Sequence, residues 1–189
     1  MKAKAVFAMP VAVKITGRTS TITNSFVNSI IPVVPPSEAD IREALAVLGM
    51  SPESITCAYC GDKTSEWDHL RPLVRGKRPT GFISEIANLV PACGKCNQSK
   101  SGADWYAWMV GPAKQSPKSR GVSDLEARIE RLRGFECWRE PRRVDFARVV
   151  PDELWRAHWD NHDRLHASMR DCQLIADQVR TAALRAVGA

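Results

Sequence analysis

Two pairs of cysteines constrain the fold of this 189-residue chain more than any other feature. Cys57 and Cys60 form the first CxxC pair, and Cys93 and Cys96 form the second. A two-residue gap lets both thiolates of a pair reach one zinc ion, and two pairs supply a complete tetrahedral set. Because no position is left open for water or substrate, the spacing predicts a structural zinc. Such a zinc would clamp the two ends of a small module.

The remaining cysteines and the charge bear on compartment and partners. Cys137 and Cys172 lie far from the pairs, and we expect them to be buried free thiols. Pro10 interrupts the apolar run near the start, so the chain has no convincing export signal. Paired CxxC units without such a signal favour a reducing compartment, and we therefore expect a cytoplasmic protein. No stretch approaches the ~20 apolar residues that cross a bilayer, and we expect no membrane partner. The formal net charge of +6 favours polyanionic partners, nucleic acid first.

The segment between the cysteine pairs has the pattern of two strands and a helix. Residues 67–72 alternate apolar and polar, a Gly/Pro-containing turn follows, 86–92 is a second strand candidate, and a helix can begin soon after it. This ββα unit presents His69 beside Asp68, and Asn97 at the helix start. A base for water and oxygen ligands for a divalent cation are the groups that phosphodiester hydrolysis needs.

These residues resemble the HNH (ββα-metal) endonuclease family over roughly residues 57–102. The matching identities are Asp68-His69-x-x-Pro72 and Asn88-Leu89-Val90-Pro91-x-Cys93-x-x-Cys96-Asn97-x-x-Lys100. The resemblance implies an α+β fold, in which a zinc-clamped ββα-metal module is embedded in a mostly helical protein.

The resemblance also implies a role for each matching residue. His69 would be the general base that takes a proton from the attacking water. Asp68 and Asn97 would bind one catalytic Mg²⁺ or Mn²⁺, with Asn97 where many members have a histidine. Asn88 would be structural and bridge the loop that positions His69. The products would carry 5′-phosphate and 3′-hydroxyl ends.

The loop between the two strands departs from the family pattern. Eighteen residues separate His69 from Asn88, several more than in compact members. Phosphate contact is expected from basic residues in and around this loop: Arg71, Arg75, Lys77, Arg78 and Lys100. Neighbours on a regular strand point to opposite faces, so Asp68 and His69 can share a metal site only where the strand is distorted or ends.

The flanking segments are predicted to be mostly helical. We expect helices at residues 37–49, 104–111, 123–134 and from 151 to about 187, and a strand near 5–15. Ser37 and Ser123 are expected to cap the first and third of these helices. The last pattern is long for a single domain, which favours either a break or a role in dimerisation.

A histidine stripe marks the last of these helices. His158, His162 and His166 recur every four residues, a spacing that can chelate a metal. A partly exposed face beside Trp155 and Trp159 is the simpler interpretation.

Three segments and one leading function follow from these patterns. Residues 1–50 would be an accessory, DNA-contacting segment with one helix, 51–111 the nuclease module, and 112–189 a helical region for DNA contact or dimerisation. The leading hypothesis is a restriction-type endonuclease acting on double-stranded DNA, with a homodimer as the form that would cut a palindrome. Homing, phage-type and nicking nucleases share the module. A zinc ribbon that binds nucleic acid without cutting it, an inactive partner and an RNA-directed toxin also stay open; a pure binding module has no need of Asp68, His69 and Asn97.

Overall fold

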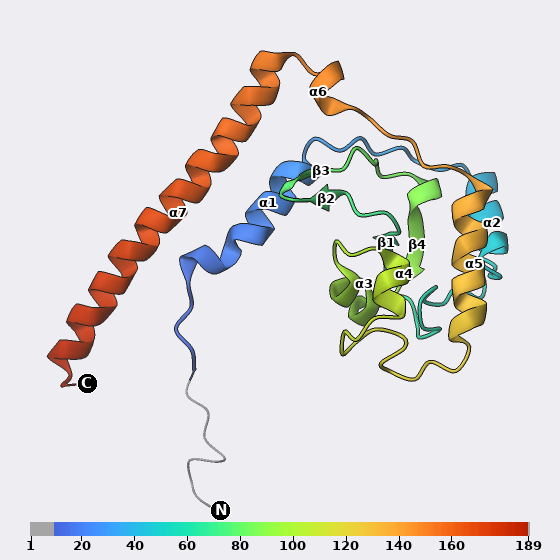
Figure 1. The fold of residues 1–189 in the computed structure, drawn as a ribbon, viewed down its shortest axis with the longest axis horizontal. Coiled ribbons are helices and arrows are strands. Elements are labelled where there is room, and N and C mark those ends of the chain that lie inside the picture. The colour runs from blue at the N-terminus through green and yellow to red at the C-terminus, as the bar shows by residue number, and fades with distance from the viewer. Residues whose placement is uncertain (1–9, 189) are drawn as a thin grey trace, which may run out of the picture. The chain divides into compact units, whose positions relative to one another are not determined.

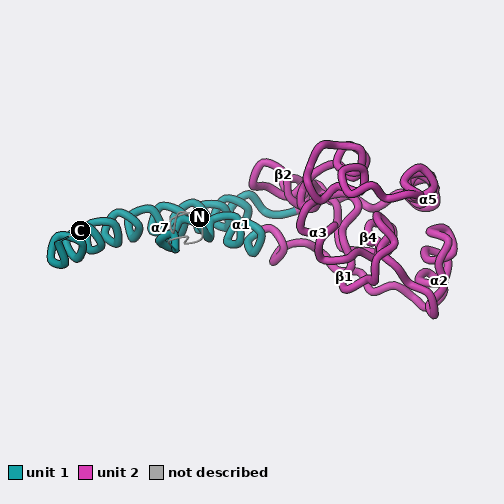
Figure 2. Tube along the Cα trace, turned by 90° about the horizontal axis from the view of Figure 1, so that it is seen from below, with its two compact units in different colours: residues 1–26, 150–189 teal, residues 27–149 magenta. Residues whose placement is uncertain are grey.

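The computed structural model describes residues 10–188, and its chain falls into two compact units (Figure 2). Unit 1 combines residues 1–26 with 150–189, and unit 2 comprises residues 27–149. Figure 1 gives the element labels used below.

Unit 1 is built from two segments that are distant in the sequence. A 3₁₀ helix, η2 (Ile15–Arg18), leads into α1 (Thr19–Asn28); η2 and α1 as far as Phe26 belong to the same unit as α7 (Asp152–Ala186). The Ile15 backbone N–H donates to Gln173 Oε1 at 2.7 Å, and the Thr23 hydroxyl lies 3.1 Å from His162 Nε2. The strand predicted at 5–15 lies partly outside the described residues. Its described part is wrong, because residues 10–14 have no regular structure and Ile15 begins η2.

The helix α7 is unbroken along its whole length, which confirms the long helical pattern. The histidine stripe differs from the prediction, since His162 and His166 are buried, with exposed fractions of 2% and 6%. Two residues of α1 explain this burial: the Phe26 ring lies 5.3 Å from the His162 ring, and the Thr23 hydroxyl lies 3.3 Å from His166 Nε2. Within residues 10–188, none of the helices combines the length and the apolar character that crossing a membrane requires.

Unit 2 contains the predicted ββα unit. Its antiparallel pair is β1 (Glu66–His69) with β4 (Leu89–Ala92), and the helix that follows is α3 (Gly94–Lys100). The register pairs Glu66 with Ala92 and His69 with Leu89. The first strand ends at His69 rather than at residue 72. The second begins at Leu89 because residues 86–88 form the 3₁₀ helix η3 (Ile86–Asn88).

The long loop between these strands carries a small hairpin of its own. The two strands are β2 (Val74–Arg75) and β3 (Arg78–Pro79), paired antiparallel. The turn residues Gly76 and Lys77 have φ angles of 57° and 64°. Two consecutive positive φ angles match the twist of a tight hairpin, and glycine adopts them without steric cost. The extra loop length is therefore an ordered hairpin whose tip is basic.

The helices around this unit are α2 (Glu38–Val47), α4 (Trp105–Met109), α5 (Leu125–Trp138) and α6 (Phe146–Val149). Ser37 caps α2 as predicted, in a reciprocal capping box with Asp40. The capping box predicted at Ser123 is wrong: the N-cap of α5 is Asp124, whose side chain makes no cap hydrogen bond. The helix also runs past Gly134, because Leu132 and Phe135 are fully buried and their packing outweighs the low helix propensity of glycine.

One hydrophobic core joins the ββα unit to its neighbours in unit 2. Val90 of β4, Leu48 beside α2, Trp108 of α4 and Phe135 of α5 all contribute buried side chains to it. Fully burying one such side chain contributes about 1.5–3 kcal/mol. The strands that carry the site residues therefore pack against helices that precede the ββα unit in the sequence (α2) and helices that follow it (α4 and α5).

The two remaining cysteines are exposed, which corrects the prediction of buried thiols. Cys137 falls outside the face of α5 that buries Ile129, Leu132 and Phe135. Cys172 lies on α7 beyond the positions that α1 covers, where neighbouring side chains such as Leu174 are exposed as well.

Candidate metal centre and nuclease site

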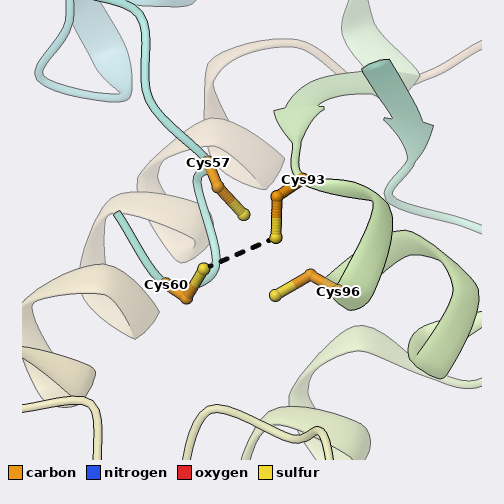
Figure 3. Close-up of side chains that lie close together, drawn as sticks. All are labelled: Cys57, Cys60, Cys93 and Cys96. Carbon is orange, nitrogen blue, oxygen red and sulfur yellow. Dashed lines mark hydrogen bonds between the residues drawn. The ribbon is translucent and has the colours of Figure 1, made fainter. Parts of the chain in front are cut away.

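Four cysteine sulfurs converge within unit 2 (Figure 3). Cys57 and Cys60 come from the loop before β1, while Cys93 follows β4 and Cys96 lies in α3. All four Sγ atoms lie within 4.8 Å of one another, and those of Cys60 and Cys93 are 3.7 Å apart. Tetrahedral Zn–S bonds of about 2.3 Å would place sulfurs about 3.8 Å apart. The four thiols are free, and the cluster fits a zinc site.

Backbone hydrogen bonds fix the first cysteine pair against the sheet. The Cys57 N–H donates to the Asp62 carbonyl at 2.8 Å, and the Gly61 N–H donates back to the Cys57 carbonyl at 2.8 Å. Gly61 has a φ of +79°, a conformation that this tight loop requires and that glycine adopts freely. The Ala58 N–H donates to the carbonyl of Pro91 in β4. The fold therefore holds the sulfurs together from both ends of the module.

The carboxylate of Asp68 is buried in a polar cluster. Its Oδ2 accepts a hydrogen bond from the Tyr59 hydroxyl at 2.6 Å and an ion pair from Lys100 Nζ at 3.0 Å. Burial raises the pKa of Asp68, an effect that the Lys100 charge opposes, and burial together with the Asp68 charge raises the pKa of Tyr59 well above its usual value. Both contacts engage Oδ2 and neither engages Oδ1, so one oxygen of the carboxylate is fixed by the protein.

The imidazole of His69 lies at the end of β1 and is half-buried. Its Nε2 is 2.9 Å from the Ser84 hydroxyl. Burial first, and the Lys100 charge second, lower the pKa of His69 to about 4. The ring is therefore neutral near pH 7, and a neutral imidazole can accept a proton.

Asn88 is fully buried and joins the two ends of the long loop. Its Oδ1 accepts from the Arg71 N–H at 2.8 Å, and its Nδ2 donates to the Arg71 carbonyl at 3.1 Å and to the Ile83 carbonyl at 3.4 Å. Its own carbonyl accepts from the Leu70 N–H at 2.9 Å. The side chain thus completes a backbone-like pairing next to His69.

Asn97 lies in α3 directly after Cys96, and its side-chain amide contacts Glu66. Asn97 Nδ2 donates to Glu66 Oε2 at 2.6 Å. Glu66 and Asp68 are two residues apart on β1 and therefore share a face of the strand. Gly94 leaves room for the glutamate, since a Cβ there would lie 2.9 Å from Glu66 Oε1. This hydrogen bond leaves Asn97 Oδ1 available on the other side of the amide.

The structure thus brings the expected residues onto one ββα unit, but with partners that the sequence did not indicate. Asp68 and His69 are neighbours at the end of β1, and their contacts lead to Lys100 and Ser84 respectively. Tyr59, Glu66 and Ser84 were missed. Only Glu66 had a signal in the sequence: it is an acidic residue two positions before Asp68, directly ahead of the strand predicted at 67–72.

The basic candidates fall into three environments. Arg75, Lys77 and Arg78 are exposed on the β2–β3 hairpin. Arg71 forms an ion pair with Glu136 at 2.9 Å, and its guanidinium lies 5.6 Å from the centre of the Phe82 ring. The Lys100 side chain is 0% exposed, because its ammonium is held by Asp68 and by the His69 carbonyl, so it is not placed to reach a phosphate.

A histidine, a carboxylate and an amide lie on a ββα unit that also carries two of the four clustered cysteines. Residues 57–102 match the family model described as HNH endonuclease. The chain is also similar to a CRISPR-associated endonuclease, Cas9, of Corynebacterium diphtheriae, at 29% identity over 153 residues. That alignment covers 77% of this chain and 13% of the Cas9. No solved structure matches the chain. Residues 57–102 are an HNH nuclease domain.

Proposed function

We propose that this chain is a metal-dependent DNA endonuclease that leaves 5′-phosphate and 3′-hydroxyl ends. The observation that supports the proposal is a neutral His69 beside Asp68 in the HNH domain, with an amide oxygen of Asn97 left open on the same unit. The similar protein of Corynebacterium diphtheriae, Cas9, is an endonuclease. The four-cysteine centre would hold a structural zinc, separate from the catalytic ion.

In this proposal His69 takes a proton from the attacking water. If Nε2–H donates to the Ser84 hydroxyl, the lone pair of the ring lies on Nδ1, which becomes the proton acceptor. Ser84 would then fix both the orientation and the tautomer of the base. Asn88 would hold the backbone that carries His69 by closing the loop at Arg71.

Asp68 and Asn97 would hold one Mg²⁺ or Mn²⁺, both of which prefer oxygen ligands. A bound divalent cation would stabilise the charge on the scissile phosphate and the leaving oxygen. Each ligand has one side occupied by a partner: Tyr59 and Lys100 hold Oδ2 of Asp68, and Glu66 holds the amide nitrogen of Asn97. Such partners orient ligand oxygens and are costly to remove.

The substrate in this proposal is double-stranded DNA, with cleavage of the restriction type by a homodimer. The exposed Arg75, Lys77 and Arg78 support nucleic-acid contact close to the catalytic residues along the chain. Exposed apolar side chains along α7 support pairing with a second copy.

The first experiment incubates purified protein with supercoiled plasmid and Mg²⁺ or Mn²⁺ and separates the products on a gel. We expect metal-dependent cleavage that EDTA abolishes and that His69→Ala reduces by at least about 10²-fold, because a general base typically contributes 10²–10⁴-fold. His158→Ala is the matched control, since it removes a histidine from unit 1 and leaves the HNH domain intact.

The pattern of products distinguishes the finer alternatives. Discrete fragments indicate sequence-specific double-strand cleavage, whereas nicked circles or a smear indicate a nicking or non-specific nuclease. Intact plasmid that is nevertheless shifted by the protein would contradict catalysis on DNA, and would favour a zinc-stabilised binding module.

A further inference from the structure

An arginine from outside the zinc-binding segments reaches one of the four sulfurs. Arg120 Nη1 donates to Cys96 Sγ at 3.4 Å, and Arg120 Nη2 donates to Asp62 Oδ2 at 2.7 Å. Asp62 follows the first cysteine pair by two residues, and Cys96 belongs to the second pair. One guanidinium therefore bridges the two halves of the metal centre. Nothing in the spacing of the cysteines indicates this contact, because Arg120 lies 24 residues beyond Cys96.

The loop that carries Arg120 is held in place by its own hydrogen bonds. Ser116 is fully buried; its hydroxyl donates to the Gly111 carbonyl at 2.8 Å and accepts from the Ser119 N–H at 3.2 Å. The Lys118 N–H donates to the Met109 carbonyl at 3.1 Å, and the Arg120 N–H donates to the Ser116 carbonyl at 3.0 Å. The arginine side chain is 21% exposed. The contact with the sulfur is thus part of a packed loop that closes over the cluster.

The positive charge of Arg120 would stabilise a zinc-filled centre. Four thiolates around a divalent zinc carry a net charge of −2 on a largely buried site, so a cation that donates an N–H to a sulfur stabilises the filled centre. The planar guanidinium suits this position because it can donate to a sulfur and to a carboxylate at once, which the single ammonium of lysine does less well. Arg128 lies nearby but donates to the Cys57 carbonyl at 3.1 Å and not to a sulfur.

We propose that Arg120 is a positioning residue of the zinc centre: it donates to the Cys96 thiolate, and with Asp62 it locks the two cysteine pairs together and slows the loss of the metal. The proposal rests on the four cysteines binding zinc. It does not require that the chain cleave DNA.

The test measures the rate at which zinc passes from the full-length protein to a chromogenic chelator in excess. We expect Arg120→Gln to release zinc about 10-fold faster than the wild type, because removing a partner of a metal ligand typically weakens metal binding about 10–100-fold. Arg120→Lys and Asp62→Asn should lie between the two, since each keeps part of the bridge. Arg131→Gln is the matched control: Arg131 contacts the Ala127 carbonyl and Asp124, and neither contact involves a cysteine.

A second readout separates metal coordination from general stability. In the cobalt-substituted protein, Arg120→Gln should shift the thiolate-to-cobalt absorption band, whereas Arg131→Gln should leave it unchanged. Arg120→Lys keeps the test open if the glutamine variant does not fold. Zinc release from Arg120→Gln at the wild-type rate would overturn the proposal. A wild-type protein that holds no zinc would overturn the proposal together with the zinc assignment. A protein that binds zinc but does not cleave DNA would contradict the proposed function alone, and the zinc-release rates of the wild type and Arg120→Gln would still decide the role of Arg120.

Discussion

The ion pair between Lys100 and Asp68 is fully buried and ties the end of α3 to β1. The Lys100 ammonium also donates to the His69 carbonyl at 2.9 Å, so the pair fixes the backbone of the proposed base. Each charge of a buried ion pair offsets the desolvation cost of the other, whereas either charge left buried alone strongly destabilises the fold. A residue that the sequence suggested as a phosphate contact is therefore a structural anchor of the site.

Replacing Lys100 with methionine should destabilise the protein strongly. We expect Lys100→Met to lower the free energy of unfolding by about 3–5 kcal/mol, because it leaves the Asp68 carboxylate buried without its cation. Chemical denaturation followed by circular dichroism measures the change. Arg42→Met is the control: its ion pair with Glu38 is exposed and contributes about 0–1 kcal/mol. Equal losses for both variants would contradict the proposed importance of the buried pair.

Single residues were predicted from the sequence where spacing alone identifies them. The four cysteines stand in CxxC pairs, and the structure brings their sulfurs together as expected. Ser84 could not be predicted, because it lies 15 residues from His69 and meets it only through the fold of the long loop. The same holds for Tyr59, whose hydroxyl reaches Asp68 across the core.

The β2–β3 hairpin is the ordered, outward part of the long loop between β1 and β4. Its exposed tip carries three cations close in sequence to the site. Each phosphate contact that such cations make releases a counterion from the DNA. The slope of the logarithm of the DNA-binding constant against the logarithm of salt concentration therefore becomes more negative by about 0.9 per contact.

Neutralising the hairpin should therefore weaken DNA binding in a salt-dependent way. We expect the combined variant Arg75→Gln, Lys77→Gln, Arg78→Gln to reduce the magnitude of the salt slope by about 2–3, in binding titrations with a duplex and Ca²⁺ in place of the catalytic ion. A variant of equal charge, with Arg42, Arg133 and Arg139 replaced by glutamine, should keep the wild-type slope. If both variants lose affinity alike, the hairpin has no special role.

Among the elements, those with a sharp amphipathic or capping pattern were predicted and those dominated by tertiary contacts were not. The helices α2 and α7 have such patterns and were confirmed. The helix α1 is rich in Ser, Thr and Asn, which have modest helix propensity, and it is stabilised through contacts such as Thr23 with His162. For α5, buried packing carried the helix through Gly134.

At the scale of the whole molecule, the C-terminal part of α7 leaves an apolar stripe on its surface. Ile175 and Val179 lie one turn apart on one face of the helix and are 59% and 64% exposed. A helix face of this kind is typical of protein–protein contacts. In the proposed homodimer this stripe would lie in the interface between the two copies.

Removing the stripe should therefore shift the protein to a monomer. We expect light scattering after size exclusion to give the mass of a dimer for the wild type at micromolar concentrations, and that of a monomer for Ile175→Asp, Val179→Asp. The control variant Leu154→Asp places one charge on the same helix at a distance from the stripe. A wild-type protein that is monomeric at all concentrations tested would contradict the homodimer.

The two-point hydrogen bond between Asn88 and Arg71 has a consequence for how such a nuclease can diversify. Because the Asn88 amide closes the base of the loop, the β2–β3 hairpin at residues 74–79 can be lengthened, shortened or exchanged without moving Ser84 or the strands that flank the loop. The catalytic framework and the surface beside it are then free to change independently. New target preferences could be grafted at this point, by natural insertion or by design, while the chemistry is inherited unchanged.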